Sequence, residues 1–372
     1  MKVAFVIFPD SLYGGIARYM AMLANGLRRI KYPFKFIIVD KSKTNKTLIM
    51  YKQFGLLDSE LIVAKDEMSA IKLMNKLNVI VYPSIKNAGD TPFFKKNPNA
   101  YPWWYDVVTA MDKPAVAFVH AEYDYTKYGP YADIYESYCQ AFIAGKYSIA
   151  LKYGEDRGKV DCYSLPLPID CRKQYDLSVK RGHLISMTAR IDSVKRLHHM
   201  VAAAKSLSSW QLDFHSGVTA RDYFYMQNLL KIADSAINID FIDYDHAFSD
   251  DELDNIYKHT ALTFNATYFP NGHDGIEYAT LEACLRGVVP LISPEIVWPI
   301  VGCPPLDAYY KFEIYGKYRN STENNLVDVV NAIHVGSRDF KERQRAIMNH
   351  VKENHDSAVI ADQLIQILES VK

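Results

Sequence analysis

Short apolar runs alternate with amphipathic segments along the whole chain. In the first half, the apolar runs predict strands over residues 3–8, 36–39, 79–82, 115–120 and 141–145. Two intervening segments repeat apolar residues at helical spacing and predict helices over 16–29 and 69–75. Strands that alternate with helices in this way indicate a parallel sheet covered by helices.

The same alternation restarts in the second half. It predicts strands over 183–187, 212–215, 239–242, 262–265 and 289–292, and helices over 196–207, 250–259 and 278–285. Between the two series, prolines and charged residues interrupt the pattern over 164–181. We therefore predict an α/β chain of two Rossmann-like domains, over 1–170 and 171–345, with a helix over 346–372 that crosses back to the first domain. Parallel sheets bind ligands at the carboxyl ends of their strands, so a central cleft between the two domains is the expected site.

Composition narrows the class of protein. Hydrophobic residues make up 49% and charged residues 23% of the chain, which is typical of a soluble globular protein. The formal net charge is zero, which excludes a strongly basic nucleic-acid binder at the level of the whole chain. The 5 cysteines include no C-x-x-C pair, so a disulfide scaffold and a zinc ribbon are disfavoured and a cytoplasmic location is expected. No apolar stretch approaches the length of about 18 residues that spans a membrane.

A first candidate motif, Ser186–Leu197, follows the first strand of the second half. It places Arg190 and Lys195 on the loop at the carboxyl end of that strand, where a helix begins. Two cations beside a helix N-terminus can bind a diphosphate and stabilise it as a leaving group. Charges that merely cover the start of a helix in solvent are the alternative interpretation, and for such a pair taken alone they are the commoner case.

A second candidate motif runs from Asp274 to Pro290. Asp274 lies ahead of the predicted helix and Glu282 lies about two turns inside it, so both carboxylates can reach the same edge of the sheet. Carboxylates bind sugar or ribose hydroxyls through paired hydrogen bonds, and Gly275 lets backbone amides approach a ligand closely. An amphipathic helix with exposed acids is the alternative.

Together the two motifs resemble the donor domain of retaining glycosyltransferases of the GT-B fold. In that family a Gly-Arg-Leu-Asp-x-x-Lys-Gly loop binds the nucleotide diphosphate, and two acids separated by seven residues hold the sugar and the ribose. This chain matches the loop at Arg190, Ile191, Asp192 and Lys195. It has Ala189 and Arg196 where glycines are usual. The second motif matches at Gly275, Leu281, Glu282, Ala283 and Gly287. It departs at Asp274, where Glu is usual, and at Glu277, where Gly is usual.

The resemblance implies a role for each matching residue. Arg190 and Lys195 would neutralise the departing diphosphate, Glu282 would hold the ribose of UDP, and Asp274 with Gly275 and Ile276 would position the sugar. In the first domain, Gly14 and Gly15 would form the glycine-rich loop and His120 would contact the sugar or the acceptor. Gly217, at the end of a predicted strand, would also bind the donor. The family uses a UDP-sugar donor and needs neither a metal nor a further cofactor. It implies that the first domain binds the acceptor and the second the nucleotide sugar.

The acceptor is indicated by a narrower resemblance to bacteriophage DNA α-glucosyltransferases, which modify 5-hydroxymethylcytosine. The similar stretches are residues 62–74, 119–123 and 355–357. Aromatic residues and lysines also mix over 93–105, and lysines recur over 41–46, as on a surface that stacks bases and meets phosphates. Double-stranded DNA in a host bacterial cytoplasm is therefore the expected acceptor. A polysaccharide or lipid-linked acceptor and a non-catalytic nucleotide-binding module are the alternatives, and the donor sugar, glucose, arabinose or another, stays open.

Overall fold

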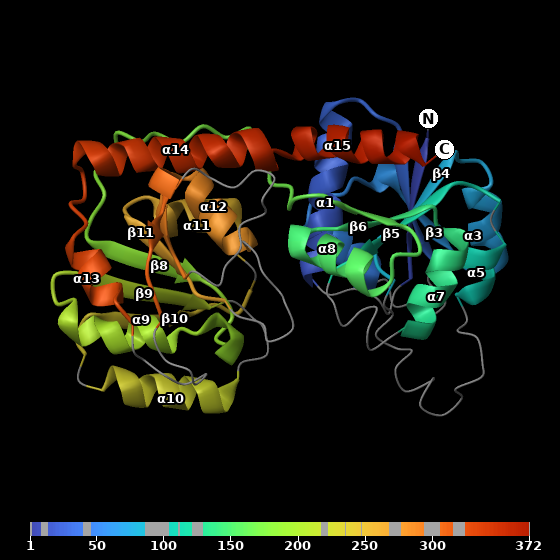
Figure 1. The fold of residues 1–372 in the computed structure, drawn as a ribbon. Coiled ribbons are helices and arrows are strands. Elements are labelled where there is room, and N and C mark those ends of the chain that lie inside the picture. The colour runs from blue at the N-terminus through green and yellow to red at the C-terminus, as the bar shows by residue number, and fades with distance from the viewer. Residues whose placement is uncertain are drawn as a thin grey trace. The chain divides into compact units, whose positions relative to one another are not determined.

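The chain forms two compact units in a computed structural model that covers residues 1–372. The structure describes residues 2–8, 14–39, 46–85, 104–110, 112–120, 129–216, 222–234, 236–246, 248–267, 277–293, 306–314 and 324–371. The first unit consists of Met1–Asp170, Asn271–His273 and His355–Lys372, and the second of Cys171–Pro270 and Asp274–Asn354 (Figure 1).

The first unit is built on a parallel sheet of seven strands in the order β3-β2-β1-β4-β5-β6-β7. The strands are β1 (Val3–Ile7), β2 (Phe34–Val39), β3 (Leu61–Ala64), β4 (Val79–Tyr82), β5 (Ala115–Val119), β6 (Ala141–Ala144) and β7 (Asp161–Ser164). The residues of β1 are all buried and alternate between two cores: Val3, Phe5 and Ile7 face one, and Ala4 and Val6 the other. A strand covered on both faces reads as a continuous apolar run, which is why the sequence marked it so clearly.

Helices cover both faces of this sheet. Their bounds are α1 (Gly14–Arg29), α2 (Lys46–Gln53), α3 (Glu67–Met74), α5 (Tyr105–Thr109), α7 (Gly129–Tyr138), α8 (Tyr147–Asp156) and α15 (Ser357–Ser370). Residues of α1 and α15 share one core with Phe5, and residues of α3, α5, α7 and α8 share the other with Val6. The unit therefore has three layers, helices on either side of the sheet.

The second unit repeats this plan with six strands in the order β10-β9-β8-β11-β12-β13, all parallel. The strands are β8 (Leu184–Thr188), β9 (Gln211–Ser216), β10 (Ile239–Asp243), β11 (Leu262–Asn265), β12 (Val289–Ile292) and β13 (Tyr310–Lys311). The helices are α9 (His198–Ala203), α10 (Tyr223–Ala233), α11 (Asp250–Tyr257), α12 (Tyr278–Leu285), α13 (Leu326–Asn331) and α14 (Arg338–His355).

The last helix of the chain belongs to the first unit. Helix α14 ends at His355, and α15 begins after Asp356, which caps it by accepting a hydrogen bond from the Ala358 amide at 2.8 Å. Short hydrogen bonds from Ile169 to His355 and from Ser357 to Ile169, 2.7 and 2.8 Å long, hold this turn against the segment that precedes the second unit. These bonds fix the start of α15 against the chain around Ile169 within the first unit.

The predicted fold class, two parallel sheets wrapped by helices, is confirmed, but some elements differ. β3, β7 and β13 were not predicted. β3 is a short apolar run in which only Ala64 is buried, and β7 and β13 have no fully buried residue. The helix predicted over 196–207 is shorter: a 3₁₀ turn over Ser193–Lys195 precedes α9, and a second 3₁₀ turn, Ala204–Ser206, follows it.

Candidate functional site

The order of strands in the second sheet places the carboxyl ends of the strands that precede the two candidate motifs next to each other. β8 and β11 are neighbours at the centre of the sheet. The strands that lie between them in sequence, β9 and β10, are on the other side of β8. This is the switch point of a doubly wound sheet, where crossing connections leave a crevice at the carboxyl ends of the strands. The loop with Arg190 and Lys195 follows β8, and the segment with Asp274 and Glu277 follows β11.

The loop after β8 presents its two cations differently. Asp192 caps the 3₁₀ turn by accepting a hydrogen bond from the Val194 amide at 3.1 Å, and its carboxylate lies 3.4 Å from the Arg190 guanidinium. The Arg190 side chain is 48% exposed, whereas that of Lys195 is 8% exposed. The Arg190 side chain is thus accessible to a ligand, whereas the Lys195 side chain is buried.

Lys195 forms an ion pair with Glu277, which sequence reasoning did not foresee. The Lys195 ammonium donates to the Glu277 carboxylate across the gap between the two motifs. Glu277 is the N-cap residue of α12, but its side chain makes no capping hydrogen bond to the helix. The only hint in the sequence was an acid at a position where the resembling pattern has glycine.

Arg196 takes the backbone conformation that the family pattern reserves for glycine. Its φ and ψ are 49° and 38°, in the left-handed region, as it closes the 3₁₀ turn that carries Lys195. This conformation costs a side-chain-bearing residue about 1–2 kcal/mol. The position where the resembling pattern has glycine thus takes a backbone conformation that favours glycine.

Of the two acids of the second candidate motif, Asp274 and Glu282, only Glu282 lies within the described residues. It lies inside α12, is 5% exposed and is preceded by Thr280, whose hydroxyl accepts a 3.0 Å hydrogen bond from the Asn265 amide at the end of β11. This bond fixes the start of α12 against the sheet. The other residues expected here lie outside the described residues; they are Gly217, Asp274, Gly275 and Ile276.

Three buried hydroxyl groups line the same edge of the second sheet. Ser216 ends β9, Thr267 follows β11, and Ser293 follows β12, and each is less than 5% exposed. None of the three hydroxyls has a hydrogen-bond partner within the described ranges. Buried polar groups normally form hydrogen bonds. These three hydroxyls can therefore form hydrogen bonds with groups other than the described residues.

In the first unit, Gly14, Gly15 and His120 follow the carboxyl ends of strands of the sheet. The glycines open α1, the first helix after β1, and a Cβ atom at Gly15 would meet no described atom within 4 Å. Packing within the described chain therefore does not demand glycine at that position, whereas close approach of a ligand would. No acidic residue lies in the first turn of α1, so its N-terminus stays favourable for an anion.

His120 follows β5 and is fixed as a neutral imidazole. Its Nε2 donates a 2.6 Å hydrogen bond to the Pro83 carbonyl, since a carbonyl can only accept. Burial lowers the pKa of His120 to about 4, although the Pro83 carbonyl opposes that shift. The ring stacks on Phe118 with centroids 6.0 Å apart. With the proton on Nε2, Nδ1 is a hydrogen-bond acceptor at neutral pH.

The aromatic segment over 93–105 is in part core. Trp104 is completely buried and stacks on Tyr135 with ring centroids 5.2 Å apart. It also lies beside Phe8, directly after β1. The expectation that Trp104 belongs to a base-stacking surface is therefore wrong, because its ring is buried against Tyr135 and Phe8. The rest of the segment up to Trp103, and residues 41–45, lie outside the described residues.

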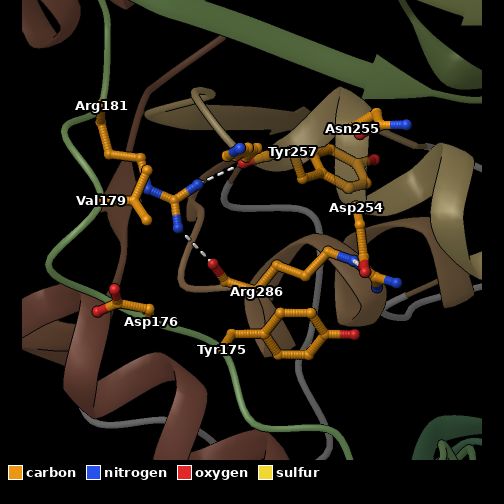
Figure 2. Close-up of a pocket in the computed structure, with 9 residues that line it drawn as sticks. Tyr175, Asp176, Val179, Arg181, Asp254, Asn255, Tyr257 and Arg286 are labelled. Atoms are coloured by element: carbon orange, nitrogen blue, oxygen red, sulfur yellow. Dashed lines mark hydrogen bonds and ion pairs between the residues drawn. The ribbon is translucent and has the colours of Figure 1, made fainter.

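A cavity of about 280 Å³ lies at the opposite edge of the second sheet (Figure 2). Its walls include Arg181, which precedes β8, and Arg286, at the C-terminal end of α12. The Arg181 guanidinium donates to the carbonyls of Tyr257, Thr260 and Arg286, and burial lowers its pKa to about 10. Arg286 in turn pairs with Asp254 at 2.7 Å. The guanidinium groups of both arginines are therefore bound to carbonyl and carboxylate groups of the protein itself.

Within the described ranges, no helix is both long and apolar enough to cross a membrane. In that same part of the chain, no group of three or more histidines, cysteines or acids is arranged to hold a metal ion.

Comparison with solved structures identifies the architecture. HepE of Anabaena, solved with UDP and glucose, has a TM-score of 0.70 at 12% identity, over 100% of both chains. The fold is the GT-B fold. A glycosyltransferase from Rickettsia africae has a TM-score of 0.68 at 12% identity, over 100% of this chain and 98% of that one. An alpha-glucosyltransferase solved with UDP and a 13-mer DNA containing an HMU base has a TM-score of 0.68 at 12% identity, over 99% of both chains.

These likenesses extend over the complete GT-B architecture, so both units are accounted for. The sequence itself matches no family model and no curated protein. Because identity is this low, the comparisons establish the GT-B fold alone, and the chemistry must be argued from the site.

Proposed function

We propose that the chain is a retaining glycosyltransferase that moves a sugar from a UDP-sugar to an acceptor hydroxyl without a metal. The observation that carries the proposal is the meeting of Arg190, Lys195 and the start of α12 at the switch point of a GT-B second sheet. Cations and a helix N-terminus at that place suit a diphosphate. The solved structures of HepE and of the alpha-glucosyltransferase, which share this fold, contain UDP.

The second unit binds the nucleotide sugar in this proposal. Arg190, which is half exposed, and Lys195 neutralise the diphosphate as the bond to the sugar breaks. Glu282 accepts hydrogen bonds from the ribose hydroxyls, and Asp274 with Gly275 and Ile276 positions the sugar. Gly217 and the buried Ser216 hydroxyl complete the donor contacts at the end of β9.

The first unit supplies Gly14, Gly15 and His120. The glycines let the N-terminus of α1 approach the donor. Neutral His120 contacts the sugar or the acceptor hydroxyl, and at neutral pH it does not act as a strong base. The acceptor attacks from the side on which the diphosphate leaves, and a diphosphate oxygen takes its proton. This route, which the family resemblance implies, keeps the configuration at the sugar carbon.

The acceptor we propose is the hydroxymethyl group of 5-hydroxymethylcytosine in phage DNA. The resembling stretches over 62–74, 119–123 and 355–357 support it, as does the shared fold of an alpha-glucosyltransferase solved with DNA. The burial of Trp104 removes one ring from the expected base-stacking surface. A polysaccharide or lipid-linked acceptor is therefore the second candidate.

One transfer assay tests both levels of the proposal. The protein is incubated with UDP-glucose or UDP-arabinose and with either hydroxymethylcytosine-containing or unmodified DNA, and the nucleosides are analysed by mass spectrometry. A sugar mass added only to the modified DNA would establish the DNA acceptor and name the donor. Release of UDP without transfer to DNA would support the transferase activity but indicate a carbohydrate or lipid acceptor. If the protein neither bound nor turned over any UDP-sugar, the proposed function would be refuted.

A further inference from the structure

Both candidate diphosphate-binding cations already have a carboxylate partner. Asp192 lies 3.4 Å from Arg190 and belongs to the same loop. Glu277 pairs with Lys195 and comes from the other side of the switch point, after β11. The Asp192 partner is part of the pattern that this loop resembles. The Glu277 partner departs from the resembling pattern, in which glycine is usual at that position.

The Lys195–Glu277 pair is partly buried. The side chains are 8% and 23% exposed, so water compensates each charge only in part. Removing one member of such a pair leaves the other charge uncompensated, which is costly. A diphosphate bound beside Lys195 carries the same sign of charge as Glu277, so both anions compete for one ammonium.

We propose that Glu277 is a positioning residue that acts through Lys195 and is exchanged for the donor's diphosphate. Glu277 holds the ammonium at the switch point when no donor is bound. On donor binding, Lys195 turns to the diphosphate, and on product release it returns to Glu277, which favours the departure of UDP. This inference rests on the proposed function, because it requires the diphosphate to bind at Arg190 and Lys195.

The exchange predicts an unusual outcome for Glu277→Gln. Without the carboxylate, the Lys195 charge is uncompensated until UDP binds, so the protein without nucleotide should be destabilised while the UDP complex is not. By linkage, UDP should then bind about tenfold more tightly, which corresponds to about 1.4 kcal/mol. Inhibition by the product UDP should strengthen by the same factor. Glu277→Asp, which keeps the charge, should return most of the wild-type behaviour.

The experiment measures UDP binding by calorimetry and melting temperature with and without UDP. Glu342→Gln is the matched control, because it removes the acid of the exposed Arg338–Glu342 pair in α14 and changes the net charge equally. Repeating Glu277→Gln in a Lys195→Met background tests the coupling, and there the gain in UDP affinity should largely disappear.

The outcomes separate the inference from the function on which it rests. A lower Kd for UDP in Glu277→Gln, with a larger stabilisation by UDP than in wild type, supports the exchange. An unchanged or higher Kd, or an equal loss of melting temperature with and without UDP, means that Glu277 only supports the start of α12 and overturns the exchange alone. Failure of the wild-type protein to bind UDP would overturn both.

Discussion

The junction of α1 with the C-terminal helix α15 depends on one glycine. A Cβ atom added at Gly26, inside α1, would lie 1.9 Å from the Ser357 carbonyl oxygen and 2.9 Å from the Ala361 Cβ atom. Ser357 begins α15, and its amide donates a 2.8 Å hydrogen bond to Ile169. Gly26→Ala should therefore separate the two helices.

The size of the effect follows from this geometry. Ordinary contact begins at about 3.4 Å, so the two backbones must move apart by about 1.5 Å. Such a movement strains the Ser357–Ile169 hydrogen bond and the 2.9 Å ion pair between Arg29 and Asp356. It also loosens the fully buried face of α15, which consists of Ile360, Ala361, Leu364 and Leu368. Overpacking with loss of these contacts should cost about 3–5 kcal/mol, beyond the gain of about 1 kcal/mol for Ala over Gly in a helix.

Gly154→Ala is the matched control for this prediction. Gly154 also lies inside a helix, α8, but a Cβ atom there would meet no described atom within 4 Å. It should stabilise the protein by about 0.5–1 kcal/mol. Urea unfolding followed by circular dichroism gives both changes, and limited proteolysis reports whether α15 detaches. If Gly26→Ala were as stable as Gly154→Ala, the close packing of α1 on α15 would be refuted.

Three further predictions concern pH, catalysis and metals. His355 is buried and its pKa is lowered to about 4 by loss of solvation, so its stabilising contribution is complete above pH 6.5 and is lost as the pH falls towards 4. About 2 kcal/mol of the free energy of unfolding should be lost at pH 5. Urea midpoints at pH 7.5 and 5 should show a smaller drop for His355→Asn than for wild type. An equal drop would contradict the lowered pKa of His355. Arg190→Ala should abolish turnover with little loss of stability because the side chain is 48% exposed. Arg338→Ala, on the exposed face of α14, is the control and should leave the rate unchanged. Wild-type activity in Arg190→Ala would contradict the assignment of Arg190 to the donor's diphosphate. Transfer in excess EDTA should equal transfer without it, and loss of activity that Mg²⁺ restores would show that a metal takes part.

The sequence alone was informative wherever a local pattern decides the structure. Strands such as β1, buried on both faces, appear as unbroken apolar runs, and the carboxyl end of each run marks a place where a ligand can bind. The Arg190–Lys195 loop and the Asp274–Glu282 segment could therefore be assigned to strand ends, with the resemblance supplying the chemistry. Short or half-exposed strands such as β13 gave no such signal.

Tertiary structure decided what depends on neighbours in space. The sheet order makes β8 and β11 adjacent, which brings Lys195 to Glu277 across 82 residues of sequence. The Pro83 carbonyl fixes the tautomer of His120, and Trp104 turns inward onto Tyr135. Periodicity reports only which face of an element is buried. Partners of a charge or a ring come from elements far away along the chain, so only the folded arrangement of the strands determined them.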